Sequence, residues 1–262
     1  GARRKLSKRK DPEAAVSYYH EKGIPIEAVK LYLLTIANSN FEAWHDANPC
    51  ASIYDFKFDF KKMSESGSLF DVEKLNNISK NYISKLKATE VYENLKKYTI
   101  EYDKDFFEII DKNKEYTINI LNIEREQKKP RKDYASYSDI KNHIWYMYDE
   151  LFNSKNYEFQ KINNMGEVCN LLKVYINKYY DENDDNEQWF NKIKELCDEF
   201  GYASNMKEYK ENPEKFKGSV ADVSTVIRVA LTTKSMTPDL YEIMKLLGKD
   251  RIINRINILN VD

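Results

Sequence analysis

The chain has 262 residues, of which 42% are hydrophobic and 32% are charged, and its formal net charge at pH 7 is −1. These values predict a soluble protein able to bury a core, and they exclude a generally basic nucleic-acid binder, so any RNA contact must come from local patches. Seven glycines and six prolines are too few for a turn-rich all-β protein. No apolar run is long enough to span a bilayer, so we expect no membrane association.

The cysteines Cys50, Cys169 and Cys197 are odd in number, far apart and without the spacing of metal ligands. We therefore predict free thiols in a reducing compartment, no bound metal and a cytoplasmic location.

The first described pattern is a basic cluster at residues 3–10, Arg-Arg-Lys-Leu-Ser-Lys-Arg-Lys. By itself it is typical of a solvated tail or of a patch that binds nucleic acid without specificity. Asp11 and Pro12 then have the pattern of an N-cap and a first helical position. They predict a helix through Tyr19 that ends near Gly23.

Apolar spacing predicts a second helix from Pro25 to Asn38 and a short one from Phe41. Residues 53–60 alternate apolar and polar side chains, and no partner strand follows, so we predict an extended, half-buried connector there. From Asp71, which is placed to cap a helix, to about Gln127 the pattern is again helical.

Residues 128–132, Lys-Lys-Pro-Arg-Lys, break that pattern, and they predict either a boundary or a loop that contacts an RNA backbone. Ser138 and Asp139 then cap a predicted helix that carries Trp145 and Leu151. Its aromatic side chains could stack on bases, but at helical spacing we expect them in the core.

Two further helices are predicted from Met165 to Tyr180 and from about Trp189 to Gly201. The acidic residues 181–185 between them match no known cation loop, and we interpret them as a solvated turn.

The last block predicts a helix through Val226 to Thr232, a polar turn, and a helix with Thr237 as N-cap and Pro238 at its first position. Gly248 ends that helix, and a final one follows with Arg251 and Arg255 at its side. The predicted fold class is therefore all-α, with multi-helix bundle subdomains.

Lys5-Leu6-Ser7-Lys8-Arg9 resembles the KMSKS-type loop of class I aminoacyl-tRNA synthetases, in the KLSKR form of glutamyl-tRNA synthetases. Three blocks occur in the order and spacing of bacterial members: KLSKRKDPEAAV, GIPIEAVKLYLLTIANSNFEAW and SGSLFDVEKLNNIS. The resemblance implies that these five residues bind ATP and that Lys8 contacts its phosphates. A mobile ammonium there would stabilise the negative charge that builds up as the α-phosphate is attacked.

Residues 62–66, Lys-Met-Ser-Glu-Ser, resemble the KMSKS consensus even more closely. Glu65, however, stands where the lysine that contacts phosphate belongs, and a carboxylate there would repel a triphosphate. We therefore take the first copy as functional and the second as structural.

The C-terminal block resembles the R-x-A-L-x-G … T-P-x-L-[FY] signature of the same family's anticodon-binding bundle. The resemblance implies anticodon contacts at Arg228, Thr237, Pro238, Leu240 and Tyr241. A guanidinium can pair with a base edge, and the N–H groups at a helix start can meet bases or phosphates. Thr233 stands where the family has glycine, which puts the local backbone in question.

The resemblance implies the C-terminal portion of a glutamyl-tRNA synthetase. The full-length enzyme would use ATP with Mg²⁺ to join L-glutamate to tRNA(Glu) through a glutamyl-adenylate. The chain has no HIGH-type histidine motif and no alternating βα pattern, so we expect it to be inactive alone and to hold no cofactor. We expect a monomer with a KLSKR loop and stem-contact region (1–85), a helical anticodon-binding subdomain (86–155) and a C-terminal anticodon-binding bundle (156–262).

Two alternatives remain open at this point. A glutaminyl-tRNA synthetase fragment would normally be a β-barrel in this part, and the strand pattern for it is missing. A non-catalytic helix-turn-helix protein could use the turn at residues 232–236 on DNA, although the low net charge and the lack of a basic recognition helix weigh against it.

Overall fold

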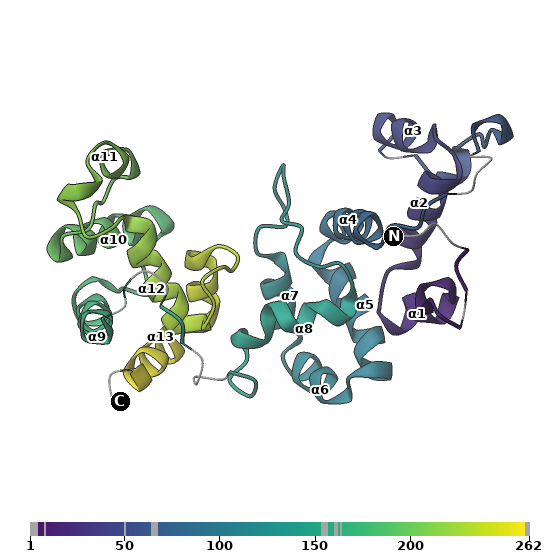
Figure 1. The fold of residues 1–262 in the computed structure, drawn as a ribbon. Helices are drawn as coiled ribbons and strands as arrows, with labels where there is room; N and C mark the ends of the chain where they lie inside the picture. Colours follow the sequence, from purple (N-terminus) through teal and green to yellow (C-terminus); the bar gives the residue numbers. More distant parts are fainter. Residues whose placement is uncertain are drawn as a thin grey trace. The chain divides into compact units, whose positions relative to one another are not determined.

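The computed structural model describes residues 5–7, 9–49, 51–63, 68–152, 157–159, 162 and 164–259. In this part of the chain there are 13 α-helices, several single-turn helices and no β-strand (Figure 1). The all-α prediction is confirmed, and the β-barrel expected of a glutaminyl-tRNA synthetase is not found among these residues. Nor does any described helix have both the length and the apolar character needed to cross a membrane.

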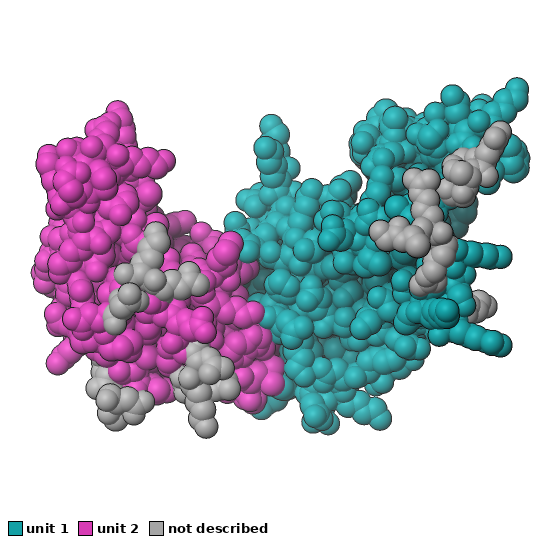
Figure 2. All heavy atoms as spheres, in the orientation of Figure 1, with its two compact units in different colours: residues 1–143 teal, residues 144–262 magenta. Residues whose placement is uncertain are grey.

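The chain divides into two compact units, residues 1–143 and 144–262 (Figure 2). The division into three regions at residues 85 and 155 stays a prediction.

The described residues of the first unit form eight α-helices, of which α8 ends at the boundary. Their bounds are α1 Val16–Glu21, α2 Ile26–Ala37, α3 Phe41–Ala47, α4 Val72–Lys85, α5 Ala88–Tyr102, α6 Lys104–Lys112, α7 Lys114–Asn122 and α8 Tyr137–Ile144. Helix α2 packs on α4 through Val29, Tyr32 and Leu75. The Tyr32 hydroxyl accepts a hydrogen bond from the Asp71 backbone N–H at 2.6 Å, and the Asp71 carboxylate caps α4 as predicted by accepting from Lys74 N at 3.0 Å.

The start of α1 differs from the prediction. Pro12–Ala14 form a separate 3-10 turn, and Ala15 is extended (φ −102°, ψ 136°), so the α-helix begins only at Val16. Asp11 does not cap a helix, because its carboxylate accepts instead from the backbone N–H of Ser7 at 2.8 Å. The side chain that looked like a helix signal therefore closes the basic turn that precedes it.

The end of α1 is fixed against the rest of the unit at Gly23. This residue has φ +65°, and a Cβ there would lie 2.8 Å from the Tyr98 ring, so glycine is needed for both the conformation and the space. Its carbonyl accepts from Tyr137 N at 2.9 Å, and the Tyr98 hydroxyl donates to Glu21 O at 3.2 Å. The predicted helix end at Gly23 is confirmed.

The connector at residues 53–60 was predicted as extended, and this is wrong at both ends. Single 3-10 turns form at Ile53–Asp55 and Phe60–Lys62, because Ser52 and Asp59 cap them. Phe56 is half-buried, whereas Phe60 is exposed. Of the second KMSKS-like copy, residues 64–66 lie outside the described residues.

In the second unit, the residues with a described structure form five α-helices, preceded by a 3-10 turn, η4 Trp145–Met147. The helices are α9 Met165–Val174, α10 Asn186–Phe200, α11 Met206–Glu211, α12 Val220–Thr232 and α13 Leu240–Leu259; a π-helical turn, Tyr175–Tyr179, extends α9, and a 3-10 turn, Pro213–Lys215, follows α11. The helix predicted to carry Trp145 and Leu151 thus ends at Ile144. Helix α12 packs against α9, α10 and α13 and is buried along most of its length.

Within α13, Gly248 (φ +75°, ψ 164°) separates two helical segments, as the sequence predicts. Arg255 in the second segment was expected at the helix side but is only 3% exposed. Its Nη1 donates to Tyr146 O at 2.8 Å and to Leu231 O at 2.7 Å, and its guanidinium lies 3.8 Å from the centre of the Phe152 ring. Arg255 is therefore a core residue that joins three segments.

Cys169 and Cys197 are free thiols, as predicted, and Cys50 lies outside the described residues. Burial raises the pKa of the Cys197 thiol to about 12, so this thiol stays protonated at neutral pH.

Candidate nucleic-acid interface

The N-terminal basic segment forms a short turn in the first unit. The backbone N–H groups of Lys10 and Asp11 donate to Ser7 O at 2.9 and 2.8 Å. In turn, the Ser7 N–H donates to the Asp11 carboxylate at 2.8 Å. Lys5 and Arg9 are exposed, as is Leu6, and Ser7 is half-buried. Lys8, the predicted phosphate contact, lies outside the described residues. The turn thus presents at least two cationic side chains around a fixed serine.

The predicted anticodon residues all belong to the second unit, where Arg228 lies at the centre of the turn between α12 and α13. Its Nη1 donates to Pro238 O at 2.8 Å and to Thr237 O at 3.4 Å, and it also bonds the Thr237 hydroxyl. The structure therefore brings Arg228, Thr237 and Pro238 together, with the guanidinium half-buried beneath the turn.

The start of α13 differs from the prediction. Thr237 does not cap the helix, because its hydroxyl contacts Arg228 and donates to Pro238 O at 2.9 Å. Asp239 is the capping residue, with its carboxylate accepting from Glu242 N at 2.9 Å, and α13 begins at Leu240. The Thr-Pro pair is therefore part of the turn, and the helix starts after it.

Leu240 and Tyr241 face inward to different degrees. Leu240 is 3% exposed, so its side chain serves the core. The half-buried Tyr241 donates its hydroxyl proton to Asp184 O at 2.9 Å, and its ring centre lies 5.7 Å from that of Trp189. Burial and nearby Asp185 raise the pKa of Tyr241, which keeps its hydroxyl a hydrogen-bond donor.

The acidic residues 181–185 are used within the fold. Asp185 caps α10 by accepting from Gln188 N at 2.8 Å, and Asp184 pairs with the Lys192 ammonium at 2.7 Å. Among the residues that the structure describes, no group of three or more His, Cys, Asp or Glu side chains could hold a metal ion. The segment forms a turn as interpreted, but it is not solvated throughout, because Asp184 is only 8% exposed.

A family profile described as "Anticodon binding domain" matches residues 90–259. The chain belongs to this family. The matched residues include α12, the turn held by Arg228 and α13, so the family places these helices in an anticodon-binding domain. The alternative of a DNA-binding helix-turn-helix is not favoured.

Similar proteins include glutamate–tRNA ligases. One from Clostridium perfringens strain 13 is 43% identical over 258 residues, covering 97% of this chain and 47% of that protein. Another from Acetivibrio thermocellus is 45% identical over 259 residues, covering 99% of this chain and 47% of that protein. The chain spans about half the length of the curated relatives it matches. A crystal structure of a glutamate tRNA ligase from Elizabethkingia meningosepticum has the same fold, with a TM-score of 0.63 at 17% identity over 99% of this chain and 49% of that one.

Sequence reasoning missed Lys234 and Thr232, which lie beside the turn held by Arg228. The Lys234 ammonium lies 5.9 Å from the centres of the Trp145 and Tyr146 rings, a cation–π arrangement. The Thr232 hydroxyl accepts from Lys234 N at 3.1 Å and donates to Arg228 O at 2.7 Å, which connects the lysine to the arginine. The position of Lys234 between Arg228 and the Thr-Pro pair could have indicated its role in the turn. Its aromatic partners, however, are almost 90 residues away in sequence.

Proposed function

We propose that this chain is the C-terminal, tRNA-binding portion of a bacterial glutamate–tRNA ligase that acts on tRNA(Glu). The observation that carries the proposal is the turn in which Arg228 bonds Thr237 and Pro238, within a chain that belongs to the anticodon-binding domain family. Support also comes from the glutamate–tRNA ligase relatives, which match it along nearly its whole length. We propose that the full-length enzyme is a cytoplasmic monomer.

The turn suits single-stranded anticodon bases for a physical reason. RNA sequence is read mostly on unstacked bases, through hydrogen bonds to their edges and stacking on flat side chains. A guanidinium has five N–H donors in a fixed plane, and the contacts to Thr237 and Pro238 set the orientation of that plane before RNA arrives. Pre-organisation of this kind lowers the entropy cost of binding. We assign base contacts to Arg228, to the Thr237–Pro238 turn and to the first turn of α13 at Leu240 and Tyr241.

The basic turn at residues 5–9 would bind ATP during the activation of glutamate. In the full-length enzyme the glutamate carboxylate attacks the α-phosphate of ATP, which forms glutamyl-adenylate and releases pyrophosphate. A ribose hydroxyl at the tRNA end then attacks the acyl carbon and releases AMP. Lys5, Lys8 and Arg9 supply cations of the kind that bind a triphosphate, with Lys8 as the phosphate contact. We propose that the chain by itself does not catalyse ATP–pyrophosphate exchange.

The test is a binding titration of the chain with three RNAs: glutamate tRNA, the same tRNA with a changed anticodon, and an unrelated tRNA. We expect glutamate tRNA to bind best and Arg228→Ala to erase the preference. Because the Arg228 guanidinium also donates to the carbonyls of Thr237 and Pro238, its loss could affect folding. Arg228→Lys therefore serves as a second variant that keeps the positive charge but lacks the planar guanidinium. A melting curve of each variant reports on folding. Equal binding of all three RNAs by the unmodified chain would refute the proposal.

A further inference from the structure

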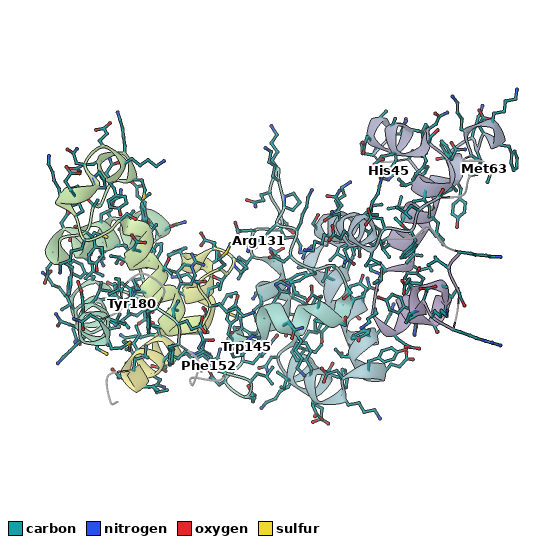
Figure 3. All side chains as sticks on the ribbon, viewed as in Figure 1. His45, Met63, Arg131, Trp145, Phe152 and Tyr180 are labelled. Carbon is teal, nitrogen blue, oxygen red and sulfur yellow. The ribbon has the colours of Figure 1, made fainter. Side chains whose placement is uncertain are left out.

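The most basic described segment outside the sites above is the loop between α7 and α8. Residues 125–132 contain five basic residues and one acidic residue, a formal charge of +4 in a chain whose total is −1. We call residues 126–132 the basic loop. In Figure 1 it stands clear of the helices around it, and Arg131 is labelled at this loop in Figure 3.

The two arginines of this segment hold the base of the loop. Arg125 is 8% exposed, and its guanidinium donates to Leu121 O at 2.7 Å and to Ile83 O at 2.7 Å. Burial lowers the pKa of Arg125, and a guanidinium stays charged in proteins. Arg131 closes the other side, with its N–H bonded to Glu124 O at 3.1 Å and its guanidinium pairing with the carboxylates of Glu124 at 3.6 Å and of Asp133 at 2.5 Å.

The lysines of the loop, by contrast, are exposed to solvent. Lys128, Lys129 and Lys132 are all exposed, and their ammonium groups are thus available on a projection with a fixed base. Gln127 bridges the tip, with its side-chain amide donating to Lys129 O at 3.0 Å, and Pro130 restricts the backbone further. The loop contains no aromatic residue, so it offers charge without a surface on which a base could stack.

We propose that the basic loop binds the phosphate backbone of a duplex stem of the tRNA, independently of sequence. The proposal rests on the proposed function, which makes tRNA the ligand of this chain. Lysine ammonium groups are compact point charges that suit phosphates, whereas base readout uses planar or aromatic groups. The loop also lies within the residues that match the anticodon-binding domain family. It therefore adds affinity, while the turn at Arg228 selects the anticodon.

The test compares Lys128→Gln/Lys129→Gln with a control that removes the same charge elsewhere. The control is Lys207→Gln/Lys210→Gln on α11, where both lysines are exposed and the two glutamates of the helix balance them. Both pairs are titrated with the three RNAs at several salt concentrations. We expect the loop variant to bind each RNA about tenfold more weakly at about 0.1 M salt and to lower the salt slope by about 1.8, the value for two duplex phosphate contacts. We expect the control to change neither.

The outcomes separate the two proposals. If the loop variant binds all three RNAs as the unmodified chain does, the loop proposal is wrong, whatever the anticodon preference. If the unmodified chain shows no preference but the loop variant has a reduced slope, the loop proposal stands and the readout at Arg228 fails. Loss of preference in the loop variant would mean that the loop reads sequence, which also contradicts the proposal.

A hydroxyl-radical footprint of glutamate tRNA identifies the part of the RNA that is bound. We expect protection of stem phosphates that disappears in the loop variant and persists in the control. Protection lost in the anticodon loop instead would refute the assignment to a stem. Lys132→Gln provides a second variant should the double substitution lower the melting temperature.

Discussion

Arg255→Met tests whether a buried guanidinium holds the second unit together. Methionine keeps an unbranched apolar stem but is shorter and lacks the donors to Tyr146 O and Leu231 O, which are 2.8 and 2.7 Å away. Each buried carbonyl left without a donor costs about 1–3 kcal/mol, and the lost contact with the Phe152 ring adds about 1 kcal/mol. We expect a loss of about 3–7 kcal/mol in the free energy of unfolding. That is a large part of the stability of a domain, which is about 5–15 kcal/mol.

The matched control is Arg251→Met, one turn earlier on the same helix. Arg251 and Arg255 both contact the Asp149 carboxylate, at 2.8 and 3.0 Å, but only Arg255 is buried. An exposed ion pair contributes at most about 1 kcal/mol, so the control should lose no more than that. The difference between the two variants gives the contribution of the buried hydrogen bonds to the free energy of unfolding, apart from that of the ion pair with Asp149.

The assay is urea unfolding followed by tryptophan fluorescence. The chain has three tryptophans, and Trp44→Phe in every variant leaves only Trp145 and Trp189, both in the second unit. The signal then reports on the unit that contains Arg255. If Arg255→Met loses no more free energy than Arg251→Met, the reasoning from buried carbonyls is wrong.

Three further predictions concern local stability. Thr233→Gly should stabilise the chain by about 1 kcal/mol in urea unfolding, because Thr233 has φ +58°, where a side chain is strained, whereas Thr233→Ala keeps the strain and should give no such gain. Asp185→Ala removes the cap of α10 and should lower the free energy of unfolding by about 1 kcal/mol, while Gln188→Ala should cost less. A hydrogen bond from His143 lowers the pKa of Asp139, so this carboxylate stabilises the fold above its unfolded pKa, and the stabilisation disappears as the pH falls through the lower folded pKa. Asp139→Asn should therefore make the free energy of unfolding depend less on pH between pH 6 and pH 2. An unchanged pH dependence would contradict this.

Most of the helices could be predicted from apolar spacing and helix-end signals. Asp71 caps α4 and Gly201 ends α10 as expected, because such contacts form between residues a few positions apart. The beginnings of α1 and α13 could not be predicted as well. Each contains several polar residues next to a proline, and tertiary contacts decide which of them caps: Asp11 bonds Ser7, and Thr237 bonds Arg228.

The buried arginines show a second limit of sequence reasoning. Arg125 and Arg255 have the sequence pattern of surface residues. Both are nevertheless buried, because backbone carbonyls from distant segments accept hydrogen bonds from their guanidinium groups. Their partners are 42 and 109 residues away, beyond the reach of any local pattern. In the candidate site, the grouping of Arg228 with Thr237 and Pro238 follows from one short turn, whereas the neighbouring Trp145 depends on a long-range contact.

The end of α1 at Gly23 has a mechanical consequence. Besides the bond to Tyr137, the Ser138 hydroxyl donates to Lys22 O at 2.8 Å, so α5 and α8 together hold three successive carbonyls of this turn. At the other end of α1, the Tyr19 hydroxyl donates to Glu13 O at 2.5 Å and thus joins the helix to the turn before it. Hydrogen bonds therefore connect the turn before α1 to the helix, and the end of the helix to α5 and α8. A force that moves α8 would reach α1 through these hydrogen bonds at Lys22 and Gly23, and the turn at Glu13 through Tyr19.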